Sequence, residues 1–335
     1  MFGVLPRSTA WWPYAGAAWT TAYGVIHVWW ALGHAPSFPP PGESYFPGTW
    51  TPVGLALLSA TVCLLIGAGA GRRRSSTARW VLVVLGWVAG AGMLLYSFMF
   101  AISLVTLIFE LDADWVTLLT RGSGVVGGVL TLAGAIAEQR RARHACPHCG
   151  RAPGHTPARR GDPAPRWAYI AGYATVVGCA VRVGGLVIDY LVTGRPLPVA
   201  LGWSFSVFVV LLILAGTLLP LALVHRWGRI WPRWVMPFAG RNVPRWLVLG
   251  PALFVGAGLT GYFGVAGMTE MVLLGQGNRV GAPLWRILME MLGYTVWGLG
   301  LLLAAISYHA LTRSECRSIP PGDGSTLPVT RRHTD

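Results

Sequence analysis

Eight long apolar stretches follow one another along this chain, with short polar segments between them. They cover Trp12–Leu32, Val53–Ala70, Trp80–Phe109, Trp115–Ala137, Trp167–Val192, Val199–Val224, Trp246–Ala266 and Trp285–Leu311. A helix needs about 20 mostly apolar residues to cross the hydrocarbon core of a bilayer. The sequence therefore predicts an all-α integral membrane protein with about eight transmembrane helices.

The composition supports a membrane protein over a soluble one. Charged residues make up 11% of the chain and hydrophobic residues 54%, whereas soluble domains carry roughly 25% charged residues. Many of the stretches begin at tryptophan, which gathers at the boundary between water and lipid; these are Trp12, Trp80, Trp115, Trp167, Trp246 and Trp285. A water-soluble surface for 335 residues cannot be built from so few charges.

Arginine alternates between the connecting segments, and this alternation predicts the topology. The segments after the second, fourth and sixth stretches, and the tail, are rich in arginine, while those between them are nearly free of it. Cytoplasmic loops carry the excess of basic residues, so we expect both termini in the cytoplasm and the protein in a bacterial plasma membrane. Because topology explains the net charge of +14, nucleic-acid binding is disfavoured.

The first four stretches resemble the last four, which predicts an internal duplication. The matching pairs include Trp12 with Trp167, Thr20 with Thr175, Arg79-Trp80 with Arg245-Trp246, Gly90-Ala91-Gly92 with Gly256-Ala257-Gly258, Trp115 with Trp285, and Ile136 with Ile306. Four spans per unit is an even number, so the two units would insert in the same orientation, as in parallel repeats of transporters.

This pattern divides the chain into four parts. We expect a first four-helix repeat over 1–137, a cytoplasmic linker rich in Arg, Pro and Gly over 138–166, a second four-helix repeat over 167–313, and a disordered cytoplasmic tail over 314–335.

Four ionisable residues inside the stretches are the candidate site. They are His27, Arg121, Arg182 and Glu290, and at 1.5 Å per residue all fall in the outer third of the bilayer. Ionisable groups within spans are costly and often functional. In the predicted repeat, His27 matches Arg182, and Arg121 lies one position from the match of Glu290. One hypothesis is therefore a pocket open to the outside that binds an anionic lipid headgroup or small anion through the two arginines.

A structural role for these residues is the alternative hypothesis. Arginines near the interface can extend their charged ends to the headgroups, an Arg121–Glu290 pair could join the two repeats, and His27 could be a packing residue beside Trp29 and Trp30.

A second motif, Cys146-Pro-His-Cys149, lies in the central linker. Zinc takes four thiolate or imidazole ligands in tetrahedral geometry, which Cys146, Cys149, His144 and His155 could supply. The second Cys-x-x-Cys of a zinc ribbon is missing, so a plain linker or a degenerate remnant is one competing interpretation, and redox chemistry of the two cysteines is another. On the cytoplasmic side a structural disulfide is not expected.

The stretch His27-Val-Trp-Trp30-Ala-Leu-Gly33 resembles the first span of a family of uncharacterised multi-pass membrane proteins from GC-rich bacteria, in which a His-x-x-Trp-Ala-Leu-Gly sequence opens the chain. The resemblance covers that span and, loosely, the general layout. It implies a multi-pass membrane fold with His27 as the family's histidine, and no activity or catalytic residue.

The sequence leaves three functions open. The first is a permease or lipid-handling protein with an outward-facing polar pocket, whose partners are membrane lipids. The second is a non-catalytic membrane scaffold or partner subunit. An enzyme ranks third, because none of the nucleotide, protease or hydrolase motifs occurs in the sequence.

Overall fold

The computed structural model describes residues 11–38, 48–69, 75–110, 115–145, 160–194, 203–267 and 284–313. These form helices and one isolated β-bridge between Ile230 and Asn242. In chain order the long helices are α1 (Trp12–Trp29), α2 (Thr51–Ala68), α3 (Ser76–Tyr96), α4 (Phe100–Glu110), α5 (Trp115–Ala142), α6 (Arg166–Thr193), α7 (Trp203–Val224), α8 (Arg245–Leu259) and α10 (Leu284–Leu311). The short segments are η2 (Trp30–His34), η4 (Arg226–Gly228), η5 (Met236–Phe238) and η6 (Thr260–Ala266).

Within the described residues, seven helices are long and apolar enough to span a membrane. They are Thr51–Ala68, Ser76–Tyr96, Trp115–Ala142, Arg166–Thr193, Ser206–Val224, Arg245–Val265 and Leu284–Leu311. The first expected span, α1, is 18 residues long but is not among them. Its tryptophans, tyrosines, threonines and His27 lower its mean hydropathy, although tryptophan and tyrosine favour the interface of a bilayer.

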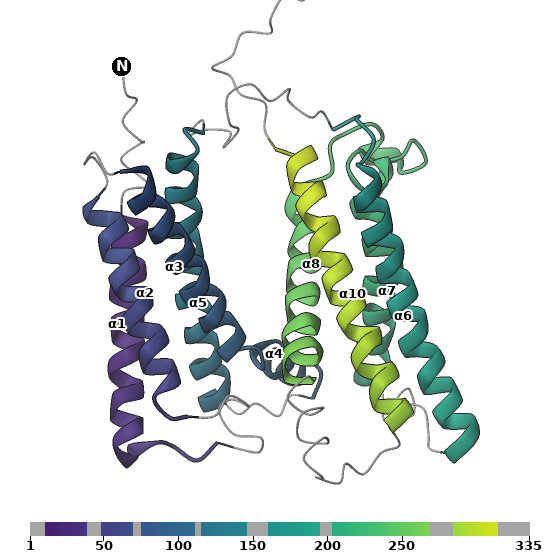
Figure 1. The fold of residues 1–335 in the computed structure, drawn as a ribbon. Helices are drawn as coiled ribbons and strands as arrows, with labels where there is room; N and C mark the ends of the chain where they lie inside the picture. Colours follow the sequence, from purple (N-terminus) through teal and green to yellow (C-terminus); the bar gives the residue numbers. More distant parts are fainter. Residues whose placement is uncertain are drawn as a thin grey trace, which may run out of the picture.

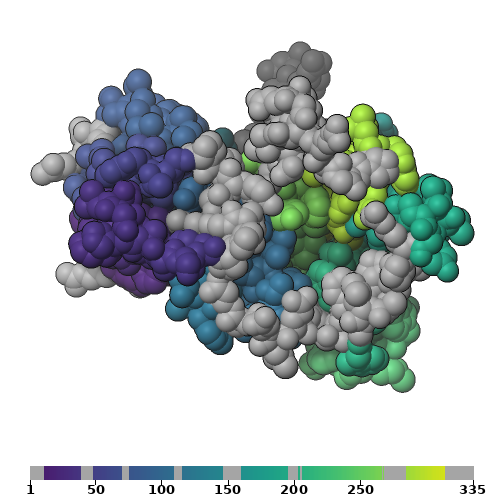
Figure 2. All heavy atoms as spheres, turned by 90° about the horizontal axis from the view of Figure 1, so that it is seen from below, coloured from purple at the N-terminus to yellow at the C-terminus, as the bar shows by residue number. Residues whose placement is uncertain are grey.

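The long helices form two bundles that stand side by side (Figure 1). The first contains α1, α2, α3 and α5, and the second contains α6, α7, α8 and α10. In each bundle the first helix packs against the second and the last, and the third packs against the second and the last. Figure 2, which views the molecule end-on, shows atoms of the first bundle on one side and atoms of the second on the other.

Paired glycines allow the third and last helices of each bundle to cross closely. A Cβ built on Gly128 of α5 would lie 3.0 Å from the carbonyl oxygen of Gly90 in α3. In the second bundle, a Cβ on Gly298 of α10 would lie 3.0 Å from the carbonyl oxygen of Gly256 in α8. Membrane helices use such small residues to bring their backbones together.

The third apolar stretch is not one helix, contrary to the sequence prediction. α3 ends at Tyr96, and α4 begins at Phe100 after a turn at Ser97–Met99. Phe98 and Met99 are buried beside Tyr262 of the second bundle, and a Cβ on Gly258 of α8 would lie 3.1 Å from the Ala101 Cβ in α4. The chain turns here because α4 packs between the bundles, as Figure 1 shows.

A buried arginine holds the segment between α7 and α8. Arg229 is 1% exposed, and its Nη1 donates to the carbonyl oxygen of Asp162 at 2.7 Å. The Tyr308 hydroxyl of α10 donates to the neighbouring Gly228 carbonyl oxygen at 3.0 Å. Burial lowers the pKa of the Arg229 guanidinium from its ordinary value, but the group remains charged because that value is far above neutral pH.

Replacing Arg229 with alanine is expected to loosen this segment. A lost charge-assisted hydrogen bond and a cavity together weaken local stability by about 1–3 kcal/mol, so cleavage by a protease within 226–243 should become roughly tenfold faster. Arg233 is exposed in the same segment, and Arg233→Ala is the matched control. Equal cleavage rates in both variants would show that Arg229 does not anchor the segment.

Candidate functional site

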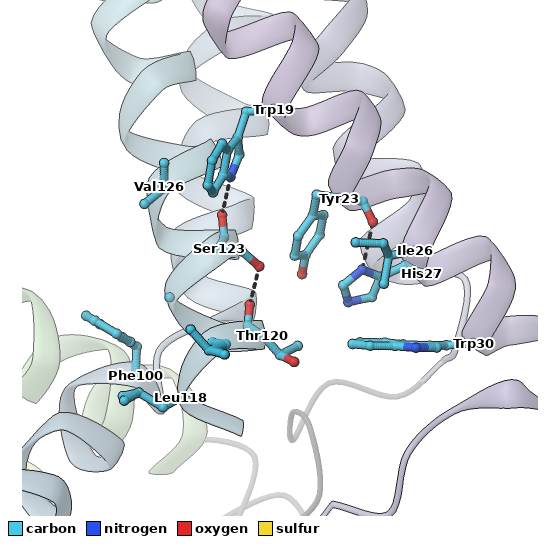
Figure 3. A pocket seen from close by; sticks show the side chains of 12 residues that line it. Trp19, Tyr23, Ile26, His27, Trp30, Phe100, Leu118, Thr120, Ser123 and Val126 are labelled. Atoms are coloured by element: carbon cyan, nitrogen blue, oxygen red, sulfur yellow. Dashed lines mark hydrogen bonds between the residues drawn. The ribbon is translucent and has the colours of Figure 1, made fainter. Parts of the chain in front are cut away.

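A groove of about 580 Å³ lies between α1 and α5, at the end of the bundle where α1 finishes and α5 begins. α1 contributes one wall, α5 the other, and Phe100 of α4 closes part of the side (Figure 3). The lining residues are Trp19, Tyr23, Ile26, His27, Trp30, Phe100, Leu118, Leu119, Thr120, Gly122, Ser123 and Val126. Its size falls in the range of small-molecule sites, which is roughly 300–1,000 Å³.

The helices hold the groove open through a few defined contacts. The Trp19 indole of α1 donates to the Ser123 carbonyl oxygen of α5 at 2.9 Å, which ties the two walls together at one end of the groove. Gly122 leaves space on α5, because a Cβ there would lie 3.2 Å from the Phe100 ring. In Figure 3, Tyr23 and His27 point from α1 towards α5, and Trp30 lies below them.

His27 is the basic residue among those that line the α1 wall of the groove. The residue is 2% exposed. Its ring centroid lies 4.0 Å from that of Tyr23 and 4.7 Å from that of Trp30. Nδ1 lies 2.9 Å from the Tyr23 carbonyl oxygen. A carbonyl oxygen only accepts, so Nδ1 is the donor in this contact.

The rest of the groove surface is apolar and open to the side. Ile26 is 48% exposed and Leu119 is 68% exposed. The Ser123 hydroxyl donates to the Thr120 carbonyl oxygen of its own helix at 2.7 Å, so this donor is already used. Such a surface suits a hydrocarbon chain, because a polar solute would lose its hydrogen bonds to water and regain few.

A second cluster of charges lies in the other bundle, between α6 and α10. Arg182 Nη2 lies 3.3 Å from Glu290 Oε1, and Arg286 Nη1 lies 3.2 Å from Asp189 Oδ2. The Arg182 guanidinium also lies over the Tyr294 ring, 5.0 Å from its centroid. The helices run antiparallel, so the two ion pairs follow one another along the seam.

The structure therefore divides the four predicted site residues between two places. Arg182 and Glu290 form an ion pair in the second bundle. His27 lines the groove in the first bundle. Arg121, next to the lining residue Thr120, is 5% exposed and donates from Nη1 to the Ser103 hydroxyl of α4 at 2.9 Å. The structure does not bring all four side chains into one pocket, and Arg182 already has a carboxylate partner. A binding role for these residues stays a prediction.

Two parts of this picture were missed from the sequence. Asp189 is 5% exposed inside α6 and pairs with Arg286. It could have been found, since it follows Arg182 by seven residues and so lies on the same helical face. The aromatic groove gave no comparable signal, because its residues come from helices distant in sequence.

The predicted zinc ligands Cys146, Cys149 and His155 lie outside the described residues, and His144 lies just before them. Among the residues that the structure describes, no three His, Cys, Asp or Glu side chains are grouped so that they could hold a metal ion.

Comparisons with protein-family models, curated proteins and solved structures found no match to this chain. The function is therefore inferred from the geometry of its own residues.

Proposed function

We propose that this chain is a lipid-handling protein of a bacterial plasma membrane that holds one hydrocarbon chain of a lipid in the groove between α1 and α5. In this proposal α1 also crosses the membrane and brings the seven spanning helices to eight, and both termini lie in the cytoplasm. The groove then opens into the outer half of the bilayer, because α1 runs outward and the groove lies at its end. The arginine-rich segments on the opposite side support this orientation.

We also propose that the two bundles are copies of one duplicated unit. Three corresponding contacts support this. Gly90 meets Gly128 as Gly256 meets Gly298. Thr20 of α1 and Thr175 of α6 are both fully buried, and each hydroxyl donates to the carbonyl oxygen four residues earlier. Each threonine also packs against corresponding places on the last helix, near Gly127 and Trp297 respectively. These pairs follow the register in which Trp12 matches Trp167 and Ile136 matches Ile306.

The lipid proposal depends on one observation, the open apolar groove within the membrane-spanning part of the chain. The lipid tail would replace the contacts that exposed side chains such as Ile26 and Leu119 otherwise make with bulk lipid. The anionic headgroup or small anion expected from the sequence remains part of this proposal, with Arg121, which follows the lining residue Thr120, as its candidate partner.

Filling the groove tests the proposal. Ile26→Trp puts a large side chain into the groove, so the bound lipid should fall at least tenfold in native mass spectra of protein released gently from membranes. Val25 is the neighbouring residue on α1, is 64% exposed and is not part of the lining. Val25→Trp is the control and should retain the lipid.

A bare protein mass in the wild type under several lipid conditions would count against a lipid site. It would favour the second candidate, a non-catalytic scaffold or partner subunit. That alternative has its own support, because Arg182 and Glu290 neutralise each other in an interhelical ion pair, which is typical of a structural contact.

A further inference from the structure

The groove between α1 and α5 runs along the two helices and has a closed end at Trp19. On α1 its lining residues begin at Trp19 and recur along one face of the helix as far as Trp30. Behind Trp19 the two helices touch, because a Cβ built on Gly127 of α5 would lie 3.2 Å from the Thr20 methyl group of α1. A hydrocarbon chain that enters from the Trp30 end therefore cannot continue between the helices.

The Trp19 side chain crosses this closed end on the outer surface of the bundle. Its indole nitrogen donates to the Ser123 carbonyl oxygen of α5 at 2.9 Å, and Figure 3 shows the ring reaching from α1 towards that atom. Trp19 is 42% exposed, so the ring lies at the surface and not in the core. Because an indole N–H away from water needs an acceptor, this hydrogen bond holds the ring in place as an end wall.

The length of the groove matches the depth of one leaflet. At 1.5 Å per residue, the α1 side from Trp19 to Trp30 is about 16 Å long. The α5 side from Leu118 to Val126 is about 12 Å long. Half of the hydrocarbon core of a bilayer is about 15 Å thick. The groove can therefore hold one acyl chain of a lipid, with the headgroup end beside Trp30 and the methyl end against Trp19.

Small side chains precede Trp19 on the same face of α1. Ala15 and Gly16 lie one turn before it, and the next large side chain on this face is Trp12. Without the indole, the groove would extend over the surface of α1 beside Ala15. The added length is about one helical turn of 5.4 Å, or roughly four methylene groups of an extended chain.

We propose that Trp19 determines which lipids the groove accepts, because it stops the methyl end of the bound acyl chain and so limits the length of that chain. This inference rests on the proposed lipid binding. It assigns the substrate class as a lipid whose chain extends about 16 Å from the Trp30 end of the groove. Overfilling a fixed apolar site forces groups out of their preferred conformations, so a longer chain binds more weakly.

Competition between two phosphatidylglycerols tests this length limit. The full chain is given equal amounts of the myristoyl and the stearoyl lipid, whose chains differ in length by about one helical turn, and native mass spectrometry measures the bound ratio. The wild type should retain the myristoyl lipid at least about fivefold over the stearoyl lipid. Trp19→Ala should bring this ratio to about one or below, and Trp19→Leu, which keeps part of the bulk, should give an intermediate ratio.

Trp29→Ala is the matched control, because Trp29 is an exposed tryptophan of α1 outside the groove lining. It should keep the wild-type ratio. Melting temperatures show which variants are folded, and if Trp19→Ala is not, Trp19→Leu decides the result. An unchanged ratio in the folded Trp19 variants, or an equal shift in Trp29→Ala, would overturn the length limit.

Ile26→Trp distinguishes failure of this inference from failure of lipid binding itself. If Ile26→Trp loses both lipids while the Trp19 variants keep the wild-type ratio, the groove binds lipid but Trp19 does not select its length. If Ile26→Trp retains both lipids, or the wild type binds neither, the groove is not the lipid site and both proposals are wrong.

Discussion

Replacing Gly178 with alanine is expected to destabilise the second bundle by about 1–3 kcal/mol. A Cβ at this position would lie 2.7 Å from the Gly293 carbonyl oxygen and 2.8 Å from the Trp297 amide nitrogen. Both are backbone atoms of α10, so no side chain can turn aside and the two helices have to separate. That separation would also lengthen the Arg182–Glu290 contact, which lies one turn further along the same seam.

Gly184 is the matched control on the same helix. A Cβ built there meets no described atom within 4 Å. Gly184→Ala should therefore leave stability unchanged or raise it by up to about 1 kcal/mol, because alanine is the better helix former. Unfolding by denaturant in detergent micelles measures both variants. If they lose the same stability, the close crossing of α6 and α10 does not hold the bundle together.

The second large effect should come from breaking the Arg182–Glu290 ion pair. Arg182→Met leaves the Glu290 carboxylate without its partner, and Glu290→Leu leaves the guanidinium, whose side chain is 15% exposed. An unpaired charge at this depth should cost about 2–3 kcal/mol, less than at the bilayer centre because the side chain can extend towards the interface.

The double variant R182M/E290L distinguishes the contribution of the ion pair to stability from a general packing defect. Removing both charges at once should recover at least half of the loss, since replacing a buried ion pair with apolar residues is often nearly neutral. Unfolding in micelles again provides the measurement, with exposed Arg233→Met as the control for loss of one arginine. If the double variant loses the sum of the single losses, the two side chains act independently.

Most of the expected helices occur in the structure. Several of the long apolar stretches are bounded by residues that begin or end helices for a known physical reason. Pro52 lies at the beginning of α2, where its missing amide hydrogen costs nothing. The Ser75 hydroxyl accepts from the Ala78 amide at 3.3 Å and caps α3. Gly194 ends α6 with φ of 67°, a conformation that favours glycine.

The break between α3 and α4 could not be predicted in the same way. Ser97, Phe98 and Met99 contain neither proline nor glycine, and they continue the apolar composition of the stretch. What turns the chain is the tertiary contact of Phe98 and Met99 with Tyr262, a residue far along the sequence. Tertiary packing here overrides a local pattern that favours one continuous helix.

The candidate site was only partly predictable for a related reason. The depth of a residue along a helix can be read from the sequence, and it predicts that His27, Arg182 and Glu290 all lie towards the outer side of the membrane. Which of them meet depends on the packing of the helices around each bundle. Because α6 and α10 are neighbours in the second bundle, Glu290 lies beside Arg182, while His27 faces α5 in the first bundle.

Photo-crosslinking in native membranes tests the lipid groove most directly. A phospholipid with a diazirine in its acyl chain would be incorporated, activated by light, and mapped by peptide mass spectrometry. The proposal predicts adducts concentrated on Trp19–Trp29 of α1, on Trp30 of η2 and on 118–126 of α5, with loss of these adducts in Ile26→Trp. Labelling spread evenly over exposed apolar residues, such as Ile170 and Leu191 of α6, with no change in Ile26→Trp, would contradict it.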